Sequence, residues 1–130
     1  MGTIKTKLSL QSSGSSTTTS AGFALNFADT LAIEQPVVNL ASGTVANSSD
    51  IDTIVASSAT DVTYVYIKYV SAGGGSPVLV LSTVAGTQNF SDLTIGEALF
   101  IPIKGAVGLR VTSSDSNSIT YEYGYWTKNV

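Results

Sequence analysis

Acidic and amide side chains around residue 50 are the residues best placed to do chemistry. Asp50 and Asp52 stand two positions apart, Asn47 precedes them and Asp61 follows. Oxygen ligands at alternate positions of a loop are typical of Ca²⁺ sites. This loop lacks a glycine for the sharp turn and a following glutamate for bidentate coordination. Asx side chains also commonly accept hydrogen bonds from backbone amides in turns. We therefore favour a capped turn and expect no metal site.

Two glutamates, Glu97 and Glu122, have the least routine settings among the carboxylates. A glycosidase needs two carboxyl groups facing each other across a cleft, and nothing in the sequence brings any two of the nine acidic residues together.

The run Gly73–Gly75 lacks the lysine and the helix of a phosphate-binding loop, so we interpret it as a hairpin loop. We expect no catalytic residue and no cofactor. A hydrolase that uses Asp or Glu is the least favoured alternative.

The composition excludes several classes of chemistry. The chain has 130 residues, enough for one domain, and it contains no histidine and no cysteine. These absences exclude Ser-His-Asp triads, thiol nucleophiles, disulfides and zinc fingers. Only 12% of the residues are charged and the net charge is −3, which argues against a phosphate-binding surface. Polar residues interrupt every apolar stretch, so neither a signal peptide nor a membrane-spanning segment is predicted. We expect neither nucleic acid nor a membrane as a partner.

The N-terminal residues predict an arm followed by a linker. Residues 3–10 place Ile4, Leu8 and Leu10 at alternate positions of a short strand, with polar residues between them. Residues 11–20 contain no apolar side chain, which predicts a flexible loop. We expect the arm to reach a neighbouring subunit or the shell and add a strand to an open sheet edge. The alternative is an arm that is disordered in solution, as many chain termini are.

Short apolar segments separated by turn residues follow along the rest of the chain. The strongest is Val62–Val70, whose β-branched and aromatic residues do not alternate strictly with polar ones, so we expect both of its faces to be covered. Residues 41–61 are ambiguous between a helical turn and a strand that ends near Ala56. Further strands are predicted at Phe23–Phe27, Leu31–Ile33, Val78–Thr83, Leu99–Ile103, Val107–Thr112 and Ile119–Lys128.

This pattern predicts an all-β fold. No segment longer than about one turn has helical periodicity, and the turns fall at fairly regular spacing. We expect an antiparallel β-sandwich or a jelly-roll-like barrel of about seven to nine strands. Residues 1–20 are assigned to the arm and its Ser/Thr/Gly linker, and residues 21–130 to a single β-sandwich domain.

All six tyrosines lie in two of the predicted strands, and Trp126 is adjacent to one of them. Core packing with cross-strand pairing, a subunit interface and a sugar-binding platform would each use such residues. The alternation puts Ile119 and the three C-terminal tyrosines on one face. Because the chain has few charges to keep its exterior solvated, we expect it to form a homo-oligomer. The oligomer that we favour is a trimer. The candidate interface residues are Ile4, Leu8, Leu10, Tyr121, Tyr123, Tyr125 and Trp126.

Several stretches of the C-terminal half carry a family resemblance. They are Thr63–Lys68, Leu93–Lys104 with its Gly-Glu turn, and Val107–Val111 before the ending Tyr121–Lys128. Together they resemble small virion structural proteins of tailed bacteriophages, which decorate heads or build tail parts as β-sandwich subunits of symmetric oligomers. The resemblance covers about residues 62–128 and includes no catalytic motif.

The resemblance implies a non-enzymatic structural protein of a phage particle. We expect a capsid decoration, or cement, protein that binds the head shell and stabilises it. Its partners would be the major capsid protein or other virion proteins, and its location the capsid surface. The alternative from another class is a tail or head fibre module whose exposed Tyr and Trp side chains bind a host-surface receptor or glycan.

Overall fold

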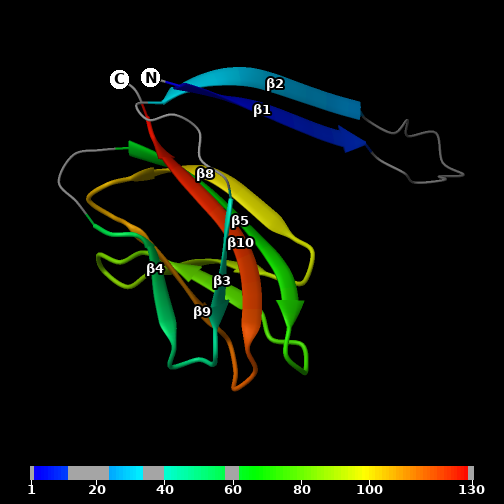
Figure 1. The fold of residues 1–130 in the computed structure, drawn as a ribbon, viewed down its shortest axis with the longest axis vertical. Coiled ribbons are helices and arrows are strands. Elements are labelled where there is room, and N and C mark those ends of the chain that lie inside the picture. Colours follow the sequence, from blue (N-terminus) through cyan, green and yellow to red (C-terminus); the bar gives the residue numbers. More distant parts are fainter. Residues whose placement is uncertain (1, 12–23, 34–39, 58–61, 129–130) are drawn as a thin grey trace, which may run out of the picture.

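The computed structural model describes residues 2–11, 24–33, 40–57 and 62–128, and within them the chain forms ten β-strands and no helix (Figure 1). The absence of helix over these residues agrees with the sequence, in which no long segment has helical periodicity. The strands are β1 (Gly2–Gln11), β2 (Ala24–Ile33), β3 (Ala41–Val45), β4 (Ile51–Val55), β5 (Val62–Ala72), β6 (Leu79–Ser82), β7 (Asn89–Leu93), β8 (Ala98–Lys104), β9 (Leu109–Ser113) and β10 (Ile119–Thr127).

Eight of these strands form a sandwich of two four-stranded antiparallel sheets. The first sheet has the order β3-β10-β5-β8 and the second the order β4-β9-β6-β7. Every connection from β3 to β10 passes from one sheet to the other, except the β6–β7 hairpin. This connectivity is that of an eight-stranded jelly roll. The prediction of an all-β, jelly-roll-like sandwich is therefore confirmed.

The remaining two strands, β1 and β2, form a separate antiparallel hairpin. They pair over their whole length, from Gly2 opposite Ile33 to Gln11 opposite Ala24. A single bridge between Ile33 and Lys128 joins the hairpin to the residue that follows β10. In Figure 1 the hairpin lies against one end of the sandwich, and its far end extends past the sandwich. The sandwich strands thus begin only at Ala41, after the hairpin is complete.

Several predicted strand boundaries need correction. The two strands expected at Phe23–Phe27 and Leu31–Ile33 are one continuous strand, β2, because the polar Asp29 in the middle lies opposite the polar Thr6 of β1. Strand β7 was not predicted, because it is a sheet edge whose residues are mostly polar and exposed. Over the described part of residues 41–61 the structure has strand rather than a helical turn, but it has two strands: β3, which was not predicted, and β4, which ends at Val55.

The main core lies between the two four-stranded sheets. Its largest fully buried side chains include two tyrosines whose hydroxyls are both satisfied: Tyr69 donates to the carbonyl of Pro77 at 2.8 Å, and Tyr121 donates to Oδ2 of Asp52 at 2.6 Å. The aliphatic members of this core are Val45, Ile54, Val55, Val65, Ile67, Leu79, Leu81, Leu93, Ile103, Leu109, Val111 and Ile119. Burial of apolar area on this scale is the main stabilising contribution to the sandwich.

The first half of strand β5 is covered on both faces, as the sequence predicted for the whole strand, whereas Lys68 and Val70 of its second half are exposed. Val65 and Ile67 point into the main core and are fully buried, while Tyr64, on the opposite face, is also buried. Tyr64 belongs to a second, smaller cluster with Ile33 and Trp126. The outer face of the first sheet is therefore covered near its end by the hairpin, and this second layer defines the candidate site.

Candidate docking groove

Aromatic and apolar side chains gather on the outer face of the β3-β10-β5-β8 sheet. Tyr64 and Tyr66 stand two positions apart on β5, so they share this face. On one side Tyr64 is paired with Trp126 of β10, and on the other side Tyr66 is paired with Phe100 of the edge strand β8. The rings of Tyr64 and Phe100 are stacked, with centroids 5.9 Å apart and planes 15° from parallel. The antiparallel register alone therefore builds an aromatic surface.

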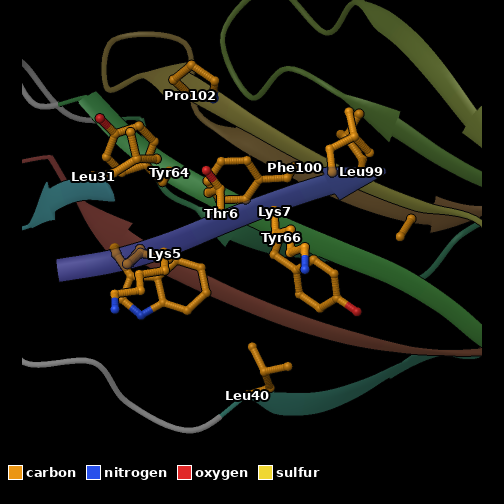
Figure 2. Close-up of a pocket in the computed structure, with 14 residues that line it drawn as sticks. Lys5, Thr6, Lys7, Leu31, Leu40, Tyr64, Tyr66, Leu99, Phe100 and Pro102 are labelled. Carbon is orange, nitrogen blue, oxygen red and sulfur yellow. The ribbon is translucent and has the colours of Figure 1, made fainter. Parts of the chain in front are cut away.

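The hairpin lies over this surface and leaves a groove beneath it. Ile4, Leu31 and Ile33, near the base of the hairpin, pack against Tyr64, Trp126 and Tyr66. Figure 2 shows Lys5, Thr6 and Lys7 of β1 crossing above Tyr64, Tyr66 and Phe100. The groove has a volume of about 860 Å³ and its lining is mainly apolar. Its remaining lining comes from Leu8, Leu40, Ala98, Leu99 and Pro102.

Gly124 allows the indole of Trp126 to lie flat on the sheet. A Cβ atom at position 124 would stand 2.8 Å from Cη2 of Trp126 and 2.8 Å from Cδ2 of Leu40, closer than real Cβ contacts allow. Since residues 124 and 126 share one face of β10, any side chain at 124 would push the indole away. The glycine is required by this close approach.

Among the described residues, the indole nitrogen of Trp126 has no hydrogen-bond acceptor. The Trp126 side chain is only 7% exposed, and its Nε1 is buried without a partner among the described residues. Leaving a buried N–H donor unsatisfied costs about 1–3 kcal/mol. The packing of the hairpin on this surface therefore carries an energetic penalty that the main core does not.

One polar pair lies beside the aromatic surface. The hydroxyl of Tyr66 donates to Oε1 of Glu122 at 3.0 Å. Burial raises the pKa of Tyr66, and the hydrogen bond to Glu122 and the negative charge of Glu122 raise it further. The tyrosine is thus neutral at physiological pH and holds the carboxylate against β5. This pair can orient a side chain, but a single carboxylate with a phenol does not make a hydrolytic pair.

The acidic loop around residue 50 is a capped turn, as favoured from the sequence. Oδ2 of Asp50 accepts the backbone N–H of Ala46 at 2.8 Å, and Oδ1 of Asn47 accepts that of Ser49 at 2.8 Å. Asp52 points elsewhere and accepts the hydroxyl of Tyr121. Asp61 lies outside the described residues. Within the described part of the chain, no group of three or more His, Cys, Asp or Glu side chains is arranged to hold a metal ion.

The other two candidate motifs also have structural roles. Oε1 of Glu97 accepts the backbone N–H and the hydroxyl of Thr94, at 2.6 and 2.8 Å. These two hydrogen bonds lower the pKa of Glu97, so it remains ionised as a turn cap. The glycine run is the loop between β5 and β6, and the N–H of Gly73 donates to the carbonyl of Ser118 at 2.8 Å. The prediction of a hairpin loop is wrong, because β5 and β6 lie in different sheets and do not pair with each other.

The predicted interface residues of the arm lie in β1. Ile4 packs in the small cluster against the sandwich, so the base of the arm contacts its own subunit. Leu8 lines the groove but is 49% exposed. Leu10 lies opposite Leu25 in the hairpin, and its side chain is outside the described set. Most of the linker assigned to residues 11–20 lies outside the described residues as well.

The predicted interface residues of the C-terminal strand divide among three environments. Tyr121 is in the main core, and Tyr123 is partly buried against that core with its ring 5.6 Å from that of Tyr121. Tyr125 is 49% exposed, beyond the last residue of β10 that pairs with β3. Trp126 is on the opposite face, under the hairpin. The structure therefore brings only Ile4, Leu8 and Trp126 together at the groove.

Sequence reasoning missed the other half of the groove. Tyr64, Tyr66 and Phe100 form the aromatic surface, and Leu31 and Leu40 line it from β2 and from the residue before β3. The period-two spacing of Tyr64 and Tyr66 was a usable signal for a shared face. The covering of that face by β1 and β2 depends on tertiary packing and has no local signal.

Comparison of the chain with known proteins found a weak similarity in fold to a solved structure. No protein-family model matches the chain, and no curated protein matches it. Among solved structures, the chain is similar to the mitogen YPM derived from Yersinia pseudotuberculosis, at 16% identity and a TM-score of 0.37, over 72% of this chain and 88% of that one. A likeness this low carries no argument about function.

Within the described part of the chain there is no helix with the length and apolar character needed to cross a membrane.

Proposed function

We propose that this protein is a structural subunit of a bacteriophage particle, a decoration subunit that binds the head shell and stabilises it. The proposal rests on the resemblance of Thr63–Lys68, Leu93–Lys104 and Tyr121–Lys128 to small phage virion proteins. Jelly-roll sandwiches are a common architecture of viral capsid domains, but the same fold has many other uses. The fold is therefore compatible with the proposal, and the surface of the protein provides further support for it.

The observation that carries the proposal is the incomplete covering of the outer sheet face. The sandwich buries its main core fully, whereas the hairpin leaves a groove of about 860 Å³ over Tyr66, Leu99 and Phe100. Exposed apolar surface of this kind marks a site of contact with another protein, a membrane or a ligand, and of these a protein partner agrees with the resemblance to virion proteins. A structural subunit needs such a surface, and it needs no catalytic group.

The glycan-binding alternative has less support from this surface. A sugar platform needs aromatic rings open to solvent, with polar groups around them. Tyr64 and Trp126 are each only 7% exposed because the hairpin covers them. Phe100 is 40% exposed but lies in a groove with a mainly apolar lining. We therefore prefer a protein partner, the major capsid protein or another virion protein, over a host glycan.

The proposal includes self-association into a trimer. Exposed large apolar side chains include Leu8 on the hairpin, Ile95 on the β7–β8 turn and Tyr125 on β10. With only 12% charged residues, the surface has few groups to oppose association. Symmetric assembly would also cover exposed sheet edges.

Electron microscopy of purified phage particles tests the function directly. Gold-labelled antibody against the protein, or difference density in an averaged reconstruction, should locate it on the head at symmetry-related positions. The recombinant protein should also bind heads that have been stripped of it, in a fixed ratio to the major capsid protein. Location at the tail tip alone, or binding to host-surface glycans without binding to heads, would overturn the decoration proposal.

A further inference from the structure

The β1–β2 hairpin and the sandwich each have their own hydrogen-bonded strand pairs. β1 and β2 pair with each other over ten residue pairs, and neither of the two four-stranded sheets includes a strand of the hairpin. The main core likewise has no member from β1 or β2. Among the described residues, the bridge between Ile33 and Lys128 is the one backbone pairing that joins the hairpin to the sandwich. Separating the two parts would therefore leave the sheets and the core of the sandwich intact.

Few side chains hold the hairpin on the sandwich. Ile33 is fully buried, and Ile4 and Leu31 pack against the same small cluster on the outer sheet face. These three residues are near the base of the hairpin. Further along, a groove of about 860 Å³ lies beneath β1, and Leu8 is half exposed. Regions with so few buried contacts open at lower free energy than the core of the same protein.

The docked hairpin also buries a polar atom that has no partner. The Nε1 atom of Trp126 is buried without an acceptor among the described residues, and its ring belongs to the cluster that the hairpin covers. Water could accept this N–H once the hairpin has left, so the unpaired donor favours separation. In the main core, by contrast, the hydroxyls of Tyr69 and Tyr121 both have acceptors. The penalty is thus specific to the contact between the hairpin and the sandwich.

We propose that the hairpin is a reversible cover of the outer sheet face. The docked state is the one that Figure 1 shows, and it exchanges with a state in which the hairpin has left and the sandwich remains folded. Undocking would add Tyr64 and Trp126, each 7% exposed when docked, to the surface already open at Phe100. A molecule that binds the uncovered rings would shift the exchange toward the undocked state. The exchange is a property of the isolated chain, so it goes beyond the proposed function and does not depend on it.

The fluorescence of Trp126 can report the undocking, because this residue is the only tryptophan of the chain. Its quenching by acrylamide is measured across a urea series at submicromolar protein, where association contributes little. In the same samples, amide exchange of peptides from β9 reports the sandwich, since Leu109 and Val111 are fully buried in the main core. We expect acrylamide quenching of the indole to rise several-fold at urea concentrations at which β9 is still protected.

A disulfide across the bridge tests whether the hairpin is the part that moves. Ile33→Cys combined with Lys128→Cys introduces the only two cysteines of the variant. The two positions lie opposite each other in an antiparallel bridge, where Cα atoms are about 4.5–5.5 Å apart, a separation that a disulfide can span. In the oxidised variant the indole transition should move toward that of β9, and the reduced form of the same protein is the matched control.

Two single substitutions separate the hairpin from the core. Leu31→Ala, which shortens a hairpin side chain of the small cluster, should move the indole transition to lower urea and leave the β9 transition unchanged. Ile67→Ala, in the main core, should move the β9 transition to lower urea.

Coincident transitions of the indole and β9 in the original protein would overturn the inference. An indole transition that is the same in the oxidised and reduced variant would also overturn it. Acrylamide quenching of the indole without urea, while β9 remains protected, would support the inference, because the undocked state would then be well populated in the native protein. Binding to stripped phage heads is a separate measurement, so the proposed function can fail while the exchange stands, and the reverse.

Discussion

The two faces of the β3-β10-β5-β8 sheet differ in how completely their side chains are packed and hydrogen-bonded. On the inner face, Tyr121 and Tyr69 are almost fully buried and both hydroxyls have acceptors. On the outer face, Trp126 is buried to a similar degree, but its indole N–H has no acceptor among the described residues, and a groove of about 860 Å³ lies beside it. The inner face is complete within one chain, whereas the outer face is not.

This difference indicates that the inner face of the sheet stabilises the fold, whereas the outer face is available for contacts with other subunits. The sandwich is held by a continuous apolar core of interlocking strands, of the kind that sets the stability of a domain. The hairpin contributes a small cluster and one bridge to the sandwich. Regions with few buried contacts open at lower free energy than the core of the same protein. We therefore expect substitutions on the two faces to have unequal effects on stability.

The largest contrast should come from shortening one aliphatic side chain on each face. Ile67→Ala removes a fully buried side chain of the main core, and a loss of about 2–5 kcal/mol in the free energy of unfolding is expected. Leu8→Ala removes a half-exposed side chain at the groove, and the isolated subunit should lose less than about 1 kcal/mol. Urea denaturation at low protein concentration measures both. Equal losses would contradict the distinction between the two faces.

The two glycines that lie under aromatic rings give a matched pair of tests. A Cβ at position 43 would stand 2.5 Å from the hydroxyl oxygen and from Cζ of Tyr121, whereas a Cβ at position 124 would meet Trp126 and Leu40 at 2.8 Å. The Tyr121 ring is fixed by Asp52, but the indole has the open groove beside it. Gly43→Ala should therefore destabilise by about 1–3 kcal/mol and Gly124→Ala by clearly less. Thermal unfolding of the two variants measures the difference, and the reverse order would contradict it.

The hydrogen bond between Tyr121 and Asp52 predicts an effect of alkaline pH. Burial, then the hydrogen bond to Asp52 and the charge of Asp52, raise the pKa of Tyr121 above its ordinary value. In the unfolded chain the phenol ionises near pH 10. This contribution to stability is therefore fully present below about pH 10 and is lost as the pH rises further, because only the unfolded state then releases the proton.

Tyr121→Phe should cost about 1–3 kcal/mol at pH 8, since it leaves the Asp52 carboxylate without its donor. The difference between this variant and the original protein should shrink above about pH 10. Denaturant unfolding at a series of pH values measures it. Tyr125→Phe is the control, because the Tyr125 side chain is half exposed and should change stability little at any of these pH values. A pH-independent difference for Tyr121→Phe would exclude this linkage.

The smallest effect is expected at Trp126. Trp126→Phe loses part of the packing area but also removes the N–H that has no acceptor, so the two changes offset each other and the net change should remain within about 1 kcal/mol. Trp126→Ala, which removes the whole ring from the small cluster, should cost more than Trp126→Phe but less than Ile67→Ala, because the hairpin can settle into the space beside the groove. Chemical denaturation of both variants provides the comparison. A large loss for Trp126→Phe would mean that the indole N–H makes a stabilising contact and that the outer face is as complete as the inner one.

The sandwich architecture could be predicted from the sequence, but the packing of the β1–β2 hairpin on it could not. Val62–Val70 and Ile119–Lys128 are rich in β-branched and aromatic residues, and both form long central strands. Strand β7 was not predicted, because the polar residues of an edge strand show no apolar alternation. The break expected within β2 came from Asp29, whose polar partner Thr6 is more than twenty residues away. Local periodicity carries no information about such a partner.

The groove could be predicted only in part for the same reason. Trp126 is out of phase with Tyr121 and Tyr125 by an odd number of residues, so the alternation of β10 already places it on the opposite face. What covers that face depends on where β1 and β2 pack on the sandwich, and no spacing within β1 or β2 specifies it. The pattern of each strand thus predicts which residues share a face, while the pairing of faces comes from the tertiary fold.

Amide hydrogen exchange at two protein concentrations tests the central distinction most directly. Peptides from β5, β9 and β10, which form the main core, should be strongly protected and unchanged between submicromolar and tens of micromolar protein. Peptides from β1 and β2 should exchange quickly when dilute and become protected at the higher concentration, because the proposed self-association would cover exposed hairpin residues such as Leu8. A hairpin as protected as β5 in the dilute monomer, or one that remains unprotected at every concentration, would contradict the account.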